Sequence, residues 1–133
     1  MTDDSRAALK VKLEISSGND VALVGAPDGF TDALGELPKN VVIRTELRGR
    51  SPFDIIILFV KSEQELTRRL TPLRGRLMPH GSLWVAWPHR ASKVKTDLNS
   101  DKVIDVMQAG DYADRKHCPF DIKWDAIAFS TGR

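Results

Sequence analysis

The strongest indication of the fold lies in the stretch of residues 77–88, which reads Leu77-Met78-Pro79-His80-Gly81-Ser82-Leu83-Trp84-Val85-Ala86-Trp87-Pro88. Its first half carries a proline and a glycine, which favour the end of a helix and a tight turn. Its second half is an unbroken apolar run, typical of a strand that is buried on both faces of a parallel sheet. The stretch therefore predicts the last step of an α/β crossover.

A second apolar run, Phe53 to Val60, predicts a neighbouring strand of the same kind. Ser62 and Glu65 after it form a capping-box pattern, which predicts that a helix begins there. A stripe of leucines with helical spacing follows: Leu66, Leu70, Leu73 and Leu77. Pro72 interrupts this stripe, so we expect a kink or a restart with Thr71 as the new cap. We expect the arginines of this segment on its solvent side: Arg68, Arg69, Arg74 and Arg76.

The rest of the chain alternates between helical and extended patterns. Helices are expected from Ser5 to about Ile15, near Thr31 to Leu37, and from about Ser100 to Ala109 with a stop at Gly110. Further strands are expected at Asp20–Ala26, Val41–Leu47, Tyr112–Cys118 and Trp124–Ser130. Residues 1–133 thus predict a single three-layer α/β domain. Its mostly parallel sheet has about six strands, helices on both faces and an antiparallel C-terminal hairpin.

Composition narrows the class of protein. A length of 133 residues fits one domain, and a formal net charge of +2 is too small to imply nucleic acid or membrane by itself. The single cysteine, Cys118, excludes an intrachain disulfide, and Met1-Thr2-Asp3-Asp4 lacks signal-peptide features. No apolar run approaches the ~20 residues of a membrane-spanning helix. We therefore expect a cytoplasmic protein.

Three motifs in succession resemble those of class I S-adenosylmethionine-dependent methyltransferases, whose fold is Rossmann-like: Phe53-Asp54, Leu77-Met78-Pro79-His80-Gly81 and Ala109-Gly110-Asp111-Tyr112. The resemblance extends from about Asp20 to Arg133 and implies a reduced version of that fold, because the usual helix and strand between Leu47 and Phe53 have no room. More narrowly, the chain is similar to a group of small bacterial proteins. They share Val24-Gly25-Ala26-Pro27, Trp87-Pro88 and a Ser-Lys-Val-x-Thr-Asp-Leu segment, which here spans Ser92 to Leu98 with Lys95 at the variable position.

The resemblance implies a cofactor turn after the first strand, and here the sequence departs from the family. The turn reads Gly25-Ala26-Pro27-Asp28-Gly29, and Pro27 has neither an amide donor nor a glycine's conformational freedom. Leu23 stands where the family has an acidic residue. Gly25, Gly29 and Glu46 remain candidates for S-adenosylmethionine binding, since Glu46 has the spacing of a ribose-binding acid. Asp28 is expected to be the N-cap of the following helix and not a ligand contact. The alternative for Glu46 is a solvated surface charge that binds no cofactor.

The segment after the central strand is the main candidate for a ligand site, because ligands of open α/β sheets bind beyond the carboxyl ends of the strands. Its candidate ligand-binding residues are Trp87, His89, Arg90, Ser92, Lys93, Lys95 and Thr96. Cations and hydroxyls of this kind suit a phosphate or carboxylate. We expect a small anionic ligand or an acidic protein segment, with Gly25 to Gly29 facing it. The alternative is an exposed loop whose cations stay in water.

Other residues carry weaker signals. His80, His89 and His117 are scattered singly, so no metal site is predicted. Cys118, beside Lys116 and His117, is a reactive thiol or a small apolar filler. Trp84 is expected in the core and Trp124 beneath the hairpin.

Three functions remain open at this stage, and no catalytic residue is assigned. The preferred one is a binding or regulatory module that is not an enzyme and needs no cofactor. The second is an active methyltransferase whose rebuilt S-adenosylmethionine pocket is lined by Gly25, Gly29 and Glu46. The third is a weak nucleic-acid binder that uses Arg90, Lys93 and Lys95.

Overall fold

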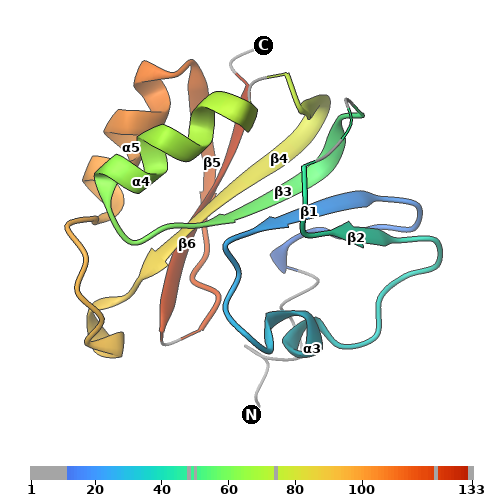
Figure 1. Ribbon diagram of the computed structural model, residues 1–133, viewed down its shortest axis with the longest axis horizontal. Coiled ribbons are helices and arrows are strands. Elements are labelled where there is room, and N and C mark those ends of the chain that lie inside the picture. Colours follow the sequence, from blue (N-terminus) through green and yellow to red (C-terminus); the bar gives the residue numbers. More distant parts are fainter. Residues whose placement is uncertain (1–11, 48, 50, 74, 122, 132–133) are drawn as a thin grey trace.

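A mixed β-sheet forms the centre of the molecule (Figure 1). The computed structural model describes residues 12–47, 49, 51–73, 75–121 and 123–131. The described residues form one sheet with strand order β2-β1-β3-β4-β6-β5. The strands are β1 Asp20–Val24, β2 Val42–Arg44, β3 Phe53–Phe59, β4 Leu77–Pro88, β5 Tyr112–His117 and β6 Trp124–Thr131. Strands β2, β1, β3 and β4 are parallel, and β6 is antiparallel to both neighbours. The predicted fold class is confirmed.

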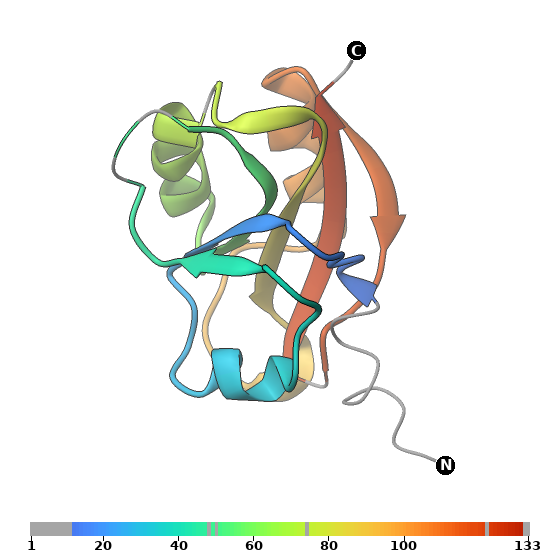
Figure 2. The same ribbon diagram turned by 90° about the vertical axis from the view of Figure 1, so that its right-hand side faces the viewer.

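Helices cover both faces of the sheet (Figures 1 and 2). The described helices are α3 Phe30–Leu34, α4 Glu63–Leu70 and α5 Ser100–Ala109, with 3-10 turns at Thr71–Leu73 and Arg90–Ser92. Helices α4 and α5 lie side by side on one face, and α3 lies near the opposite face. The predicted helix from Ser5 falls almost entirely outside the described residues. No described helix has the length and apolar character needed to cross a membrane.

Two apolar clusters fill the space on either side of the sheet. Alternate residues of β3 enter opposite clusters, with Ile56 and Leu58 beneath α4 and α5, and Ile57 facing the side of α3. Strand β4 repeats this pattern, since Val85 faces the two longer helices and Trp84 is fully buried on the other side. The predictions of strands buried on both faces and of Trp84 in the core are therefore confirmed.

The crossover helix begins where the sequence predicts and ends earlier. Ser62 is the N-cap of α4, and its hydroxyl accepts a hydrogen bond from the Glu65 amide at 3.1 Å. The helix ends at Leu70, because Pro72 lacks an amide donor and crowds the preceding turn. The predicted break is confirmed, with Thr71 at the C-cap of α4 and the first position of a 3-10 turn. The prediction that Leu77 ends a helix is wrong, since strand β4 begins there.

The Pro79 to Gly81 segment is an irregularity within β4 rather than a turn before it. Phe53 pairs with Leu77, but Ile55 pairs with Ser82, so β4 carries extra residues between the two pairs. The backbones approach closely here, because a Cβ on Gly81 would fall 2.7 Å from the Asp54 carbonyl oxygen. A glycine is therefore required where the irregular segment passes β3.

Arg76 secures the shortened connection between β2 and β3. Its guanidinium donates to the Leu47 carbonyl at 2.8 Å and to the Ser51 carbonyl at 3.0 and 3.2 Å. It also lies 5.2 Å from the centroid of the Phe53 ring. The prediction that Arg76 lies on the solvent side of a helix is wrong, because the helix has already ended at Leu70. The described residues between Arg44 and Phe53 form neither helix nor strand, as the reduced fold implies.

Candidate functional site

A cavity of about 660 Å³ opens beyond the carboxyl end of β4, beneath the segment that leads to α5. We call residues 89–99 the basic loop and this space the basic cavity. Its lining residues are Trp87, Pro88, His89, Arg90, Lys93, Val94, Lys95, Thr96, Leu98, Asn99, Ser100 and Asp125. Six of the seven predicted ligand-binding residues are thus gathered around one space, and Ser92 is the exception. Whether they bind a ligand remains a prediction.

Local hydrogen bonds shape the first half of the basic loop. The His89 amide donates to the Lys123 carbonyl at 2.8 Å, which ties the loop to the start of β6. The Ser92 hydroxyl donates to the His89 carbonyl at 2.7 Å and accepts from the Val94 amide at 3.2 Å. Ser92 is therefore a turn residue in this structure. Lys93 has a φ of 63°, a left-handed conformation that places it at the bend of the loop.

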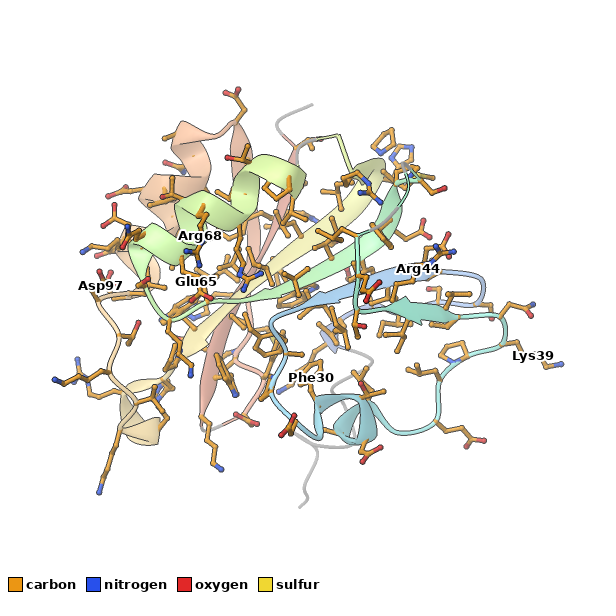
Figure 3. The ribbon with its side chains drawn as sticks, in the orientation of Figure 1. Phe30, Lys39, Arg44, Glu65, Arg68 and Asp97 are labelled. Atoms are coloured by element: carbon orange, nitrogen blue, oxygen red, sulfur yellow. The ribbon has the colours of Figure 1, made fainter. Side chains whose placement is uncertain are left out.

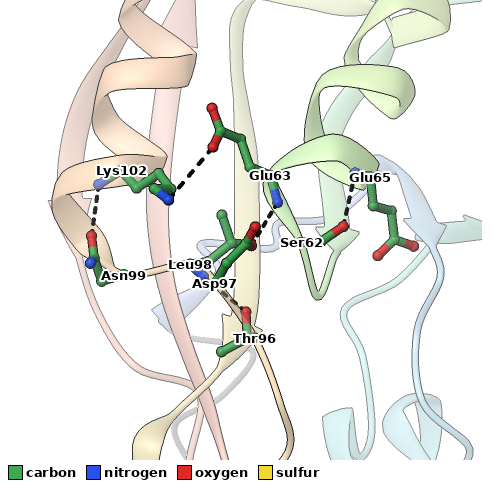
Figure 4. A network of polar contacts seen from close by, with 8 residues as sticks. All are labelled: Ser62, Glu63, Glu65, Thr96, Asp97, Leu98, Asn99 and Lys102. Atoms are coloured by element: carbon green, nitrogen blue, oxygen red, sulfur yellow. Dashed lines mark hydrogen bonds and ion pairs between the residues drawn. The ribbon is translucent and has the colours of Figure 1, made fainter.

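The second half of the basic loop is fastened to both helices above the sheet (Figure 4). The Asp97 carboxylate accepts a hydrogen bond from the Glu63 amide at 2.9 Å, in the first turn of α4. Leu98 is buried in the core, and Asn99 is the N-cap of α5, with its side chain accepting from the Lys102 amide at 2.8 Å. The Thr96 side chain accepts from the Leu98 amide at 3.1 Å. These contacts fix the wall of the basic cavity.

Positive charge dominates the polar lining of the basic cavity. Arg90, Lys93 and Lys95 are exposed, and within the described part of the chain none of them forms an ion pair. Asp125 is the one carboxylate among the described lining residues. Three cations against one carboxylate leave an excess of positive charge that favours an anion.

Trp87 and Asp125, on the neighbouring strands β4 and β6, form the floor of the basic cavity. Trp87 of β4 pairs with Asp125 of β6 in the antiparallel register. The Asp125 carboxylate lies 2.7 Å from Nε2 of His117, which belongs to the outer strand β5. The rings of Trp87 and His117 are 6.3 Å apart between centroids. Trp87 was among the predicted ligand-binding residues, whereas Asp125 and its contact with His117 were not predicted.

The three candidate cofactor-binding residues do not line the basic cavity. Gly25 follows β1 with a φ of 72°, and a Cβ there would fall 2.9 Å from the Phe59 carbonyl oxygen. Its freedom is thus needed for close packing of the turn against β3. Gly29 is the N-cap of α3, so the prediction that Asp28 caps this helix is wrong: Gly29 takes the cap with a φ of 85° and no side-chain bond. Glu46 is exposed beyond the end of β2.

Aromatic side chains occupy the strand ends near the glycine turn. Phe30 contacts the ring of Phe59 edge-on at 4.9 Å, and Phe59 contacts Trp124 in the same way at 4.9 Å. Phe120, from the turn between β5 and β6, lies 5.7 Å from Phe30. Trp124 therefore packs beneath the hairpin as predicted. Figure 3 shows Phe30, beside the glycine turn, well apart from Asp97 on the basic loop.

The residues present match the S-adenosylmethionine cradle of the resembled family only in part. Gly25 has the left-handed backbone that such a turn requires, but Pro27 supplies no amide and its carbonyl accepts from the Phe30 amide at 3.2 Å. Leu23, in place of an acid, is buried among apolar residues. The described residues contain no group of three His, Cys, Asp or Glu side chains arranged to hold a metal ion. Cys118 is half-buried and packs against the apolar cluster on the side of α3.

Solved structures share this architecture, whereas no protein-family model and no curated protein matches the sequence. The complex of DhpI with SAH superposes on 95% of this chain and 83% of its own, with a TM-score of 0.64 and 11% identity. The N-methyltransferase NodS from Bradyrhizobium japonicum covers 97% of this chain and 94% of its own, with a TM-score of 0.66 and 11% identity.

An S-adenosylmethionine-dependent methyltransferase from Clostridium acetobutylicum covers the whole of this chain and 93% of its own, with a TM-score of 0.65 and 7% identity. Likeness at these identities shows the fold. The chain therefore has a reduced class I methyltransferase fold of the Rossmann-like type, as the three motifs in its sequence implied.

Proposed function

We propose that this protein is a binding or regulatory module that holds a small anionic ligand in the basic cavity. One observation carries the proposal: Arg90, Lys93 and Lys95 surround a space of about 660 Å³ and form no ion pair with any described residue. The position also supports it, because open α/β sheets bind ligands beyond the carboxyl ends of their strands. A volume in this range accommodates a small molecule.

The anchored backbone of the basic loop strengthens this proposal. Asp97 and Asn99 tie the loop to α4 and α5, so the cations are carried by a segment whose course is fixed. A preformed loop loses less entropy when a ligand binds. A small ligand fits a space bounded by one loop and two strands better than an acidic protein segment would, and the segment remains an outcome that the test can reveal.

Titration of the full chain with inorganic phosphate, followed by amide chemical shifts, tests this proposal. We expect the largest shifts at residues 89–99. Each exposed charge contributes roughly 0.2–1 kcal/mol, so replacing Lys93 and Lys95 together by Ala should weaken phosphate binding roughly 2- to 30-fold. The single variant Lys93→Ala is compared with Lys39→Ala as its matched control, because each removes one exposed charge and Lys39 lies far from the basic loop (Figure 3). Equal weakening by the control, or no shift in the basic loop, would refute the proposal.

A second candidate function is S-adenosylmethionine-dependent methyl transfer. It is favoured by the solved structures with this fold, which include an S-adenosylmethionine-dependent methyltransferase and a complex with SAH. Gly25, Gly29 and Glu46 would hold the cofactor, which when bound supplies a methyl group to a nucleophile. Calorimetry separates the two candidates. Micromolar binding of S-adenosylmethionine that Glu46→Ala abolishes would support methyl transfer, and an absence of heat would support the binding module.

A further inference from the structure

Asp125 has an open hydrogen-bonding position at the floor of the basic cavity. Its Oδ1 atom is engaged twice, with Nε2 of His117 at 2.7 Å and with the backbone amide of Ala126 at 3.0 Å. Among the residues that the structure describes, none donates a hydrogen bond to the second oxygen, Oδ2. The side chain as a whole is 17% exposed and belongs to the lining of the cavity.

His117 holds this carboxylate in place. The two residues lie on adjacent antiparallel strands, and His117 is directly opposite Ile127, two residues beyond Asp125. The hydrogen bond to Nε2 and the neighbouring ring of Trp87 restrict the rotation of both side chains. A ligand that supplies a donor to a carboxylate with an open acceptor position gains a charge-assisted hydrogen bond.

From this arrangement we infer that Asp125 selects, among anions, those that also carry a hydroxyl group. The inference rests on the proposed function, since it assumes that the anionic group contacts Arg90, Lys93 and Lys95. The basic cavity would then take a phosphate ester with a hydroxylated body, such as a polyol phosphate. Its phosphate meets the cations of the loop, and a hydroxyl donates to Oδ2 of Asp125.

The volume and the charge distribution of the basic cavity agree with this class of ligand. A space of about 660 Å³ leaves room for a body beyond the anionic group. A purely anionic ligand would place negative charge beside Asp125, at the floor. Like charges at close range repel in a partly desolvated site. A neutral hydroxylated body avoids this repulsion.

Two phosphate esters of similar size test the inference on the full chain: glycerol 3-phosphate, whose body carries hydroxyl groups, and propyl phosphate, whose body carries none. We expect glycerol 3-phosphate to bind wild-type protein about tenfold more tightly, the effect of one charge-assisted hydrogen bond. Asp125→Asn should abolish most of this preference and leave propyl phosphate binding the same or tighter. The amide oxygen of this variant still accepts a hydrogen bond from His117, so the fold should persist. Asp105→Asn, an exposed change on α5 outside the lining of the basic cavity, should leave the preference intact.

The outcomes distinguish a failure of the role of Asp125 from a failure of anion binding in the basic cavity. Equal binding of both esters to wild-type protein would overturn the role of Asp125 and leave the basic cavity as an anion site. A preference that survives Asp125→Asn would overturn it too. If neither ester shifts the amides of the basic loop, the proposed function itself fails, and the inference falls with it. The comparison of the two esters on wild-type protein needs no variant. The role of Asp125 can therefore be refuted even if the Asp125→Asn protein is unstable.

Discussion

Replacing Gly25 by Ala should destabilise the protein far more than the same change at Gly29. Both glycines have left-handed backbones, with φ values of 72° and 85°, so each alanine incurs roughly 1–2 kcal/mol of conformational strain. They differ in their surroundings. A Cβ at position 25 would lie 2.9 Å from the Phe59 carbonyl oxygen, whereas a Cβ at position 29 would meet nothing within 4 Å.

The difference between the two variants isolates the close approach of the glycine turn to β3. Forcing a methyl group against backbone costs roughly 1–3 kcal/mol, because β1 and β3 are paired and neither can withdraw easily. We therefore expect Gly25→Ala to lower the free energy of unfolding by about 2–5 kcal/mol and Gly29→Ala by about 1–2 kcal/mol.

Urea denaturation followed by tryptophan fluorescence and far-ultraviolet circular dichroism measures both values. Coincident transitions from the two probes would justify a two-state analysis. If the two alanine variants unfold at the same urea concentration with equal slopes, Gly25 is not required for close packing of the turn against Phe59.

Three further predictions concern the supports of the site and its charge. Arg76→Ala should lower the free energy of unfolding by about 1.5–3 kcal/mol, because charge-assisted hydrogen bonds to two carbonyl oxygens are lost. Arg69→Ala breaks only an i,i+4 ion pair and should lower it by about 0.5 kcal/mol in the same denaturation assay. A smaller loss for Arg76→Ala than for Arg69→Ala would contradict this. Asp97→Ala should speed hydrogen exchange of the Glu63 amide and lower the free energy of unfolding by about 0.5–2 kcal/mol. The control Asp101→Ala should leave that amide protected. Unchanged exchange in Asp97→Ala would show that the hydrogen bond between Asp97 and the Glu63 amide does not form in solution. Raising the sodium chloride concentration about tenfold, from roughly 0.05 M, should weaken phosphate binding several-fold in calorimetry, because salt screens exposed charges. Binding that does not depend on salt would contradict a role for the loop cations in holding the phosphate.

The presence of the six strands, the start of α4 and both ends of α5 could be predicted because local signals agreed with tertiary packing. Helix α5 has the predicted bounds, Ser100 to Ala109, since Asn99 caps one end and Gly110 the other. The continuous apolar run of β3 is short and rich in isoleucine, which favours a strand buried on both faces. Where two local signals disagreed, the backbone restriction imposed by proline outweighed the helical spacing of the leucines. Leu77 fits the helical leucine spacing, but Pro72 ends the helix before that spacing can be used.

The capping of α3 shows a different limit. Asp28 has a side chain suited to an N-cap, but the backbone at Gly29 takes a left-handed conformation that starts the helix one residue later. That choice depends on how the turn packs against β3, where Phe30 enters the aromatic contacts with Phe59. Such a contact joins segments that are distant along the chain, and no local pattern reports it.

The cations of the candidate site could be predicted from the sequence, but the residues that form its floor could not. Arg90, Lys93 and Lys95 are close together in the sequence, so their shared loop was evident. Asp125 and His117 come from the last two strands and meet Trp87 only through the register of β4, β6 and β5. The pairing of Trp87 with Asp125 could have been derived only if the register of the C-terminal hairpin against β4 had been known.

A crystal structure of the full chain grown with both glycerol 3-phosphate and S-adenosylmethionine would test the central claim most directly. We predict density for the phosphate among Arg90, Lys93 and Lys95, with a hydroxyl within hydrogen-bonding distance of Asp125 Oδ2. Density for the nucleoside on residues 25–30 beside an empty basic cavity would contradict the account.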